Sequence, residues 1–153
     1  MGAFDAPEQI ALPGVVKTAP GGAAVSPMEE RFLAALLATG VFRAAPAVSD
    51  MLVAIGPLGM VLRQLPVTCA KHRYRIDFAI VAHDGRPWIA CEVDGFAFHS
   101  SKEQIVYDRQ RERALTAAGW TVLRFTGTEV HRDAEACVLE VIAMLERQRA
   151  EVG

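Results

Sequence analysis

The sequence lacks most of the short motifs that identify a common enzyme class. It contains no G-x-x-x-x-G-K-[ST] loop for phosphates, no G-x-G-x-x-G after an expected strand, no G-x-S-x-G and no H-E-x-x-H. The sequence therefore gives no support to a P-loop enzyme, a dinucleotide-binding enzyme, an α/β-hydrolase with a nucleophilic serine or a zinc protease of the usual kind.

Cysteine is also scarce. The three cysteines, Cys69, Cys91 and Cys137, form no C-x-x-C pair, and the cysteines and histidines show no zinc-binding spacing. Their odd number is more typical of a reducing compartment than of a disulfide framework.

The chain also has no apolar run of about 18 residues and no basic segment followed by an apolar one at its N-terminus. We therefore expect no membrane span, no secretory signal and a cytoplasmic location.

The chain has no strong excess of charge of either sign. Its 153 residues carry a formal net charge of −2, and 52% of them are hydrophobic. This balance excludes a strongly basic domain, but a local basic patch is still compatible with nucleic-acid binding. The length predicts one packed domain with one core. Residues 1–25 are rich in Gly, Ala and Pro without a regular period, which predicts a flexible tail or linker before a domain at residues 26–150.

The first helix is expected to begin after Ser26. Ser26 is a favourable N-cap, Pro27 occupies the first helical position, and Glu29 completes a capping box. Gly40 is expected to end this helix. For residues 41–62 we expect a short helix followed by a strand, with "MVLRQLPVT" supplying that first strand.

The segment "RYRIDFAIVAHDGRPWIACEVDGF" predicts two strands joined by a turn at Asp84-Gly85. Alternation places Tyr74, Ile76, Phe78 and Ile80 on one face of the first strand, and Arg75, Asp77, Ala79 and Val81 on the other. A helix over Lys102–Ala118, a strand in "WTVLRFTG" and a closing helix in "DAEACVLEVIAMLERQR" follow. The closing helix offers Ala136, Leu139, Val141, Ile142 and Leu145 to the core. This order predicts an α/β fold with a mixed four-stranded sheet flanked by helices.

Three carboxylates stand on the two neighbouring strands: Asp77, Glu92 and Asp94. Glu92 and Asp94 share a face, and Asp77 lies close to Glu92 if the strands pair as a hairpin. Crowded carboxylates repel each other unless a cation offsets their charge, and carboxylate oxygens suit Mg²⁺ or Mn²⁺. The alternative is that Asp77 and Asp94 end their strands in solvent and that Glu92 pairs with Arg75.

The helix over Lys102–Ala118 carries a stripe that turns polar toward its N-terminal end. Spacings of four, three, four and three place on one face the residues Gln104, Asp108, Arg111, Leu115 and Ala118. A helix that packs on a sheet usually stays apolar along the whole contact, so this stripe indicates the edge of a site. The alternative is that Asp108 and Arg111 form an ordinary surface pair.

Further polar residues surround the carboxylates. His99 is a candidate general base or phosphate ligand, and Lys102 is a candidate source of positive charge, although a structural histidine and an exposed lysine are the simpler interpretations. Basic residues gather before Asp77, on the following helix and at Arg124. This distribution fits a polyanionic substrate, whereas arginines that merely solvate helix faces are the alternative.

Taken in order, the segments "SPMEERF", "RQLPV", "YRIDFAI", "IACEVDGFAFHS", "YDRQRERAL" and "GWTVLRFTGTEV" resemble the small PD-(D/E)XK nuclease-like domains of the DUF559 and very-short-patch-repair type. The resemblance covers about residues 26–148. It implies a restriction-endonuclease-like fold and a metal-dependent endonuclease that cuts DNA, with a role in DNA repair or defence.

The resemblance also implies a role for each matching residue. Asp77 and Glu92 would hold Mg²⁺ or Mn²⁺, Glu29 on the first helix would assist them, and Gln64 would lie near the site. His99, Asp108 and Arg111 match accessory polar positions. The substrate-binding residues expected on this basis are Gln64, Lys102, Asp108, Arg111 and Arg124.

One departure from the nuclease motif concerns residue 94. The motif usually has a lysine two residues after the glutamate, and this chain has Asp94, as the resembled subfamily often does. Asp94 would bind metal or act as a base, and the positive charge would come from Lys102, Arg111 or His99. Two other hypotheses stay open. One is a non-catalytic module of the same fold that binds nucleic acid or a protein, appended to a larger DNA-processing protein; the other is an α/β enzyme acting on a small molecule.

Overall fold

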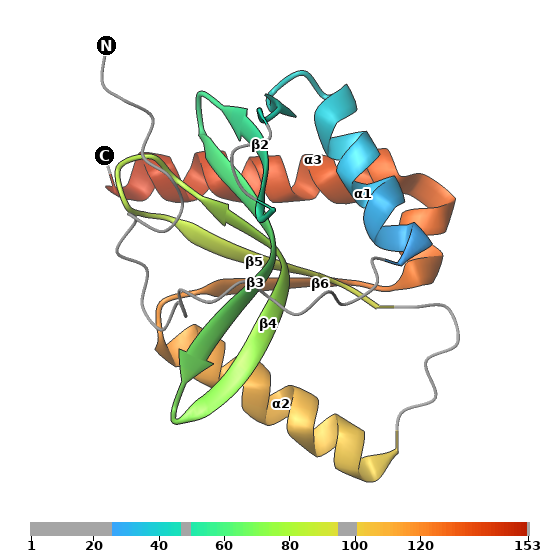
Figure 1. The fold of residues 1–153 in the computed structure, drawn as a ribbon, viewed down its shortest axis with the longest axis vertical. Helices are drawn as coiled ribbons and strands as arrows, with labels where there is room; N and C mark the ends of the chain where they lie inside the picture. The colour runs from blue at the N-terminus through green and yellow to red at the C-terminus, as the bar shows by residue number, and fades with distance from the viewer. Residues whose placement is uncertain (1–25, 47–49, 95–100, 153) are drawn as a thin grey trace.

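The computed structural model of the protein describes residues 26–46, 50–94 and 101–152. These residues form a six-stranded sheet and three helices (Figure 1). The strands are β1 (Arg43–Ala44), β2 (Leu52–Gly56), β3 (Gly59–Cys69), β4 (His72–Val81), β5 (Trp88–Val93) and β6 (Thr121–Phe125). The helices are α1 (Pro27–Ala38), α2 (Lys102–Ala117) and α3 (Gly127–Val152).

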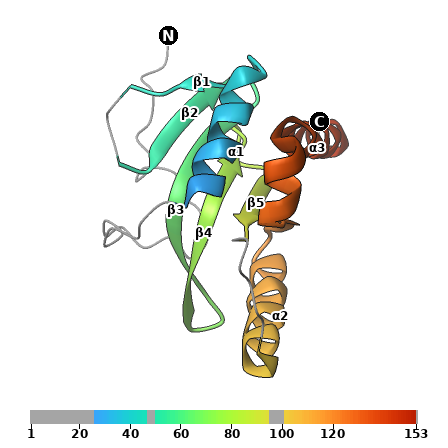
Figure 2. The ribbon, with the colours of Figure 1, turned by 90° about the vertical axis from the view of Figure 1, so that its right-hand side faces the viewer.

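The sheet is mixed, and its strands lie in chain order. All neighbouring strands are antiparallel except β5 and β6, which are parallel because α2 connects them. Helices α1 and α3 cover one face, and α2 lies on the other (Figures 1 and 2). The α/β class is therefore confirmed, whereas the expectation of four strands is wrong.

The two additional strands come from residues 41–62. We expected a short helix there, but β1 pairs with β2, and β2 forms a hairpin with β3. The run is apolar almost throughout, so its pattern does not distinguish a buried helix from a strand. Gly56, Pro57 and Gly59 place a tight turn in its middle. Glycine is required at residue 56 because a Cβ atom would lie 2.1 Å from the carbonyl oxygen of Val41. The strand expected in "MVLRQLPVT" is confirmed within β3.

The starts of α1 and α2 follow the sequence signals, whereas α3 begins at Gly127, six residues before the expected start, and is interrupted at Asp133 (φ −158°, ψ 80°). The side chain of Ser26 accepts a hydrogen bond from the amide of Glu29 at 3.2 Å, and Glu29 Oε2 accepts one from the amide of Ser26 at 3.0 Å, which confirms the capping box. Helix α2 begins at Lys102 as expected. None of the described helices is long and apolar enough to cross a membrane.

Of the residues of α3 that were expected in the core, Val141, Ile142 and Leu145 are buried as expected. Leu139 is 48% exposed and Ala136 is exposed as well, so these two assignments to the core are wrong. The residues of α3 that are buried are Val130, Cys137, Val138, Val141, Ile142 and Leu145. Val130 precedes the break at Asp133, and the other five, at spacings of three and four residues, follow one helical stripe that does not include Leu139.

The hairpin of β4 and β5 forms as expected, but the alternation along β4 breaks at Asp77. Tyr74 and Ile76 pack in the core beneath α2, whereas Phe78 and Ile80 pack in the core beneath α1 and α3. The expectation that these four side chains share one face is therefore wrong. The cause lies on β3, where Gln64 has a φ of 51°, a left-handed value that a regular strand does not use.

The close approach at Gly56 gives a direct test of the hairpin that the sequence did not predict. Gly56→Ala is expected to destabilise the protein by about 1–3 kcal/mol, because the new Cβ atom forces the backbone near Val41 to move. Urea unfolding of the variant measures this change. An unchanged free energy of unfolding would mean that residues 41–56 are not packed in this way.

Candidate active site

The candidate site lies where β4 and β5 separate. The ladder between these strands ends at the pair Phe78 and Cys91, so Asp77 and Glu92 lie just beyond the last paired residues. Asp77 fills the gap with its side chain, because its Oδ2 atom accepts a hydrogen bond from the amide of Val93 at 2.9 Å. A carboxylate thus replaces the backbone carbonyl that would continue the ladder. This geometry fixes the orientation of Asp77 and brings it beside Glu92.

Glu92 is a buried carboxylate, with only 5% of its surface exposed. Burial is the largest influence and raises its pKa to about 8; Arg111 acts to lower that pKa, and the neighbouring Asp77 carboxylate raises it further. Repulsion between Asp77 and Glu92 is therefore part of the electrostatics of the site. A buried acid under such repulsion is typical of functional sites, where a cation offsets the cost of ionisation.

Arg111 on α2 is the cation that contacts Glu92. Its Nη2 atom donates a hydrogen bond to Glu92 Oε1 and another, of 2.6 Å, to the carbonyl oxygen of Arg75. Its guanidinium also lies over the ring of Tyr74, 6.0 Å from the centroid. One arginine therefore ties α2 to both β4 and β5 at the position of the carboxylates.

Asp94 belongs to a second set of charged contacts. Its two carboxylate oxygens accept hydrogen bonds from Arg124 Nη2 on β6, at 3.2 and 3.3 Å. Arg124 also lies 3.5 Å from Asp108, which in turn accepts a hydrogen bond of 3.0 Å from Gln104. Partial burial acts to lower the pKa of Arg124, but the two carboxylates outweigh this effect, so the pKa is raised. These contacts hold the end of β5 to β6 and to α2.

The stripe on α2 therefore faces the sheet. Asp108 and Arg111 do not form the surface pair that was the simpler interpretation, because Asp108 contacts Arg124 and Arg111 contacts Glu92. Glu92 pairs with Arg111, and the alternative pairing with Arg75 is not observed among the described residues. At the apolar end of the stripe Leu115 is fully buried.

Glu29 and Gln64 meet at β3, on the opposite side of β4 from Glu92. Gln64 Nε2 donates a hydrogen bond of 2.5 Å to Glu29 Oε1, which joins β3 to the start of α1. Gln64 lies opposite Asp77, since the residues on either side of it pair with Phe78 and Ile76. Glu29 is 7% exposed, whereas the neighbouring Glu30 is exposed and pairs with Arg63. Of these two glutamates, Glu29 is the one that contacts Gln64.

The remaining candidates lie further away or cannot be placed. Lys102 is exposed at the first position of α2, nine residues before Arg111 and thus roughly 13 Å from it along the helix axis. His99 lies outside the described residues, as do residues 1–25. Sequence reasoning missed two groups at the site, the amide of Val93 and the ring of Tyr74. The pattern of apolar residues carries no signal for either contact.

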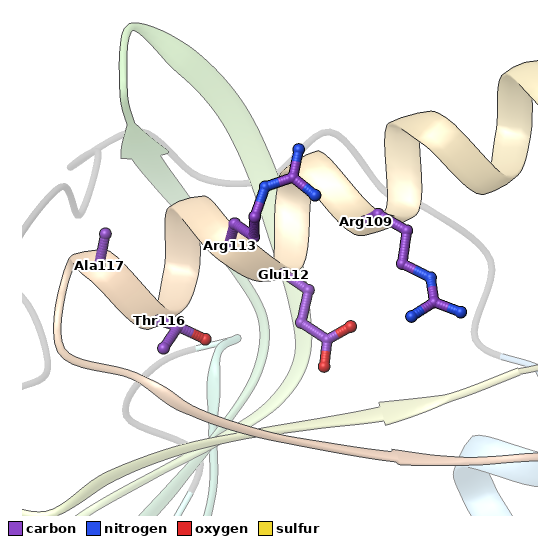
Figure 3. Close-up of a pocket in the computed structure, with 5 residues that line it drawn as sticks. All are labelled: Arg109, Glu112, Arg113, Thr116 and Ala117. Atoms are coloured by element: carbon purple, nitrogen blue, oxygen red, sulfur yellow. The ribbon is translucent and has the colours of Figure 1, made fainter.

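Helix α2 also borders two open depressions. One is lined by Ile105, Asp108, Arg109, Glu112 and Arg124, and the other by Arg109, Glu112, Arg113, Thr116 and Ala117. In Figure 3, Arg109 and Glu112 extend to the same side of the helix, and Arg113 extends away from them. Neither depression is the enclosed apolar pocket that an enzyme acting on a small molecule usually has.

The donor chemistry at Asp77 and Glu92 fits a hard divalent cation. Asp77 Oδ2 contacts Val93, Glu92 Oε1 contacts Arg111, and the two carboxyl groups also lie within hydrogen-bonding reach of each other. Two carboxyl groups this close suit Mg²⁺ or Mn²⁺. Within the described part of the chain no group of three or more His, Cys, Asp or Glu side chains lies close enough to hold a metal ion. A pair of carboxylates completed by water and phosphate oxygens is nevertheless the usual protein contribution to an Mg²⁺ site.

The family model described as REase_MTES_1575 matches residues 61–145, which is more than half of the chain. The matched range includes Gln64, Asp77, Glu92, Arg111 and Arg124. Neither the curated proteins nor the solved structures gave a match.

The contact between Arg111 and Glu92 predicts an asymmetric effect of two arginine substitutions. Arg111→Met keeps most of the side-chain volume but removes the partner of a buried carboxylate, and we expect a loss of about 3 kcal/mol at a pH of about 8.5. Arg109→Met on the exposed side of α2 serves as the matched control and should change stability by less than about 0.5 kcal/mol. Equal effects in urea unfolding would contradict the contact.

The raised pKa of Glu92 predicts how stability depends on pH when divalent ions are removed with a chelator. Between its ordinary value of 4.5 and about 8, the folded protein keeps a proton on Glu92 that the unfolded chain has released. The contribution of Glu92 to stability is therefore lost as the pH rises through this window. Relative to Glu92→Gln, which cannot titrate, the wild type should become less stable from about pH 5 to about pH 8. A constant or rising difference would show that the carboxylate is ionised throughout.

Proposed function

The chain belongs to the restriction-endonuclease-like family REase_MTES_1575, and on that premise we propose that it is a metal-dependent endonuclease that hydrolyses phosphodiester bonds of DNA. The observation that carries this proposal is the placement of Asp77 and Glu92 side by side at the point where two strands separate, with Arg111 against Glu92. The likeness to DUF559 and very-short-patch-repair domains refines the proposal toward DNA repair or defence.

Asp77 and Glu92 would hold Mg²⁺ or Mn²⁺. A bound divalent ion supplies positive charge at the carboxylates and lowers the pKa of water near a phosphate. The protein keeps the two side chains ready for this role in different ways. The amide of Val93 orients Asp77, and Arg111 holds the buried Glu92 in place. Fixed side chains lower the cost of ordering the site when the substrate arrives.

Arg111 is the residue we propose as the source of positive charge in place of the missing lysine. Of the three candidates considered from the sequence, it contacts Glu92 directly, whereas Lys102 lies at the far end of α2. A guanidinium has five N–H donors in a planar fork, so Arg111 retains donors for a phosphate oxygen after its contacts with Glu92 and Arg75. Developing negative charge on the phosphate would thus meet a preoriented cation.

Asp94 and Arg124 would act by positioning β5. Because Arg124 holds both oxygens of Asp94, we propose that Asp94 orients the strand end next to Glu92 and that Arg124 and Asp108 keep α2 against it. Glu29 would position Gln64 beside Asp77, and both stay candidates for assisting the metal. His99 stays a candidate base or phosphate ligand.

The contact between Asp94 and Arg124 supports a second candidate function. The position two residues after Glu92 carries an aspartate that is committed to Arg124, and an aspartate cannot donate to a phosphate at neutral pH. This favours a module that binds DNA without cutting it. Such a module would bind DNA equally well with and without a divalent ion.

Cleavage of plasmid DNA in the presence of Mg²⁺ or Mn²⁺ tests the proposed function. Asp77→Asn keeps an oxygen that accepts from Val93 but loses the negative charge, and we expect activity to fall by more than about 100-fold without loss of fold. Asp84→Asn, at an exposed turn of the same hairpin, is the matched control and should cut normally. If the wild type leaves supercoiled, linear and single-stranded DNA intact and Asp77→Asn behaves identically, catalysis is refuted.

A further inference from the structure

The hairpin of β3 and β4 extends beyond the rest of the sheet. Strand β2 pairs with β3 only as far as Leu62, and β5 pairs with β4 only from Val81 to Phe78. Beyond these positions, residues 65–69 and 72–76 pair only with each other in the sheet. They form a two-stranded ribbon about 17 Å long, at about 3.4 Å per residue. Figures 1 and 2 show this ribbon extending past the other strands, beside α2.

The two faces of this ribbon differ in chemistry. One face is apolar and packs in the core beneath α2; it carries Leu65, Val67, Cys69, Tyr74 and Ile76. The ring of Tyr74 also meets Tyr107 of α2, with centroids 6.0 Å apart. The opposite face carries Pro66, Thr68, Arg73 and Arg75, of which Thr68 and Arg73 are exposed. This second face, which we call the open face, is polar and is exposed at Thr68 and Arg73.

The open face and the tip of the ribbon concentrate positive charge. Residues 70 and 71 form the tip with φ values of 51° and 67°, and Lys71, His72 and Arg73 are all exposed there. No aspartate or glutamate occurs between Cys69 and Ile76. In the described part of the chain neither Lys71 nor Arg73 has a carboxylate within ion-pair distance. This charge stands out in a chain whose formal net charge is −2.

The basic residues lead directly to the carboxylates. Arg73 lies four residues before Asp77 on β4, about 13 Å along the strand. Asp77 itself turns into the gap where Val93 and Glu92 lie. A linear polyanion bound at the tip and along this part of β4 would therefore reach the metal-binding pair with one of its phosphates.

We propose that the open face and tip of the β3–β4 ribbon bind the phosphate backbone of the DNA substrate and guide it to Asp77 and Glu92. The inference rests on the proposed nuclease function for its substrate, but it assigns a binding surface outside the active site. Contacts of this kind depend on charge and little on sequence, because lysine and arginine release counterions from phosphates. They set the affinity for DNA and the register of the protein on it, whereas Asp77 and Glu92 take part in the reaction.

The salt dependence of DNA binding tests this proposal. The full chain, with chelator present, is titrated against a fluorescent duplex of about 20 base pairs, between about 50 and 200 mM salt. Lys71→Gln/Arg73→Gln is expected to weaken binding by about tenfold or more and to reduce the slope of log K against log salt by about 1.8, or 0.9 for each lost phosphate contact. Each single variant should give about half of this change in slope. The matched control Arg43→Gln/Arg147→Gln removes two exposed arginines elsewhere and should leave the slope unchanged.

The outcomes separate this inference from the proposed function. If the wild type cuts DNA and the ribbon variant shows a raised KM with an unchanged kcat, both stand. If the wild type does not cut but the ribbon variant still loses binding and slope, the nuclease proposal fails and the ribbon surface stands. An unchanged slope in a ribbon variant that unfolds at the same urea concentration as the wild type overturns the inference. An equal loss in the control double variant overturns it as well.

Discussion

The contact between Arg111 and the buried carboxylate of Glu92 is the interaction on which the rest of the site depends. Burial favours the protonated form of Glu92 and raises its pKa to about 8, since a carboxylate in an apolar interior is costly to ionise. Arg111 opposes this effect, and because it also holds the backbone of Arg75, the same side chain attaches α2 to the sheet. Charge balance and architecture are thus coupled. If α2 packed on the sheet only through Leu115, no contact would fix the position of its polar N-terminal half.

The backbone prepares this arrangement through one local irregularity. At Gln64 and Asp77 the alternation of side chains between the two faces of the sheet shifts by one residue in both β3 and β4. On the ribbon side of this point the apolar side chains pack only in the core beneath α2, and on the other side they pack in the cores on both faces. The change places Asp77 in the gap between β4 and β5 instead of on the surface of the sheet. The ribbon beyond this point exposes Thr68 and Arg73 on the face opposite α2. Strain at Gln64 is offset by its hydrogen bond to Glu29, which is itself fixed by the cap of α1.

Local signals in the sequence predicted the elements but not their junctions. The capping box at Ser26, the turn at Asp84-Gly85 and the polar stripe on α2 each depend on residues close in the chain, and each is confirmed. The phase change at Asp77 depends on the backbone angle of a residue on another strand, so alternation alone could not reveal it. The partner of Asp94 likewise comes from β6, thirty residues later. The extra hairpin was missed because its apolar run resembles a buried helix as much as a strand.

We propose that Asp77 and Glu92 form one metal-binding pair and that Asp94 does not belong to it. Anomalous diffraction from crystals soaked in Mn²⁺ tests this claim most directly, because it locates the ion without relying on activity. We predict one anomalous peak between the carboxylates of Asp77 and Glu92, with Asp94 still paired to Arg124. A peak at Asp94 and Asp108, or no peak at Asp77 and Glu92 in a crystal that binds Mn²⁺ elsewhere, would contradict the account.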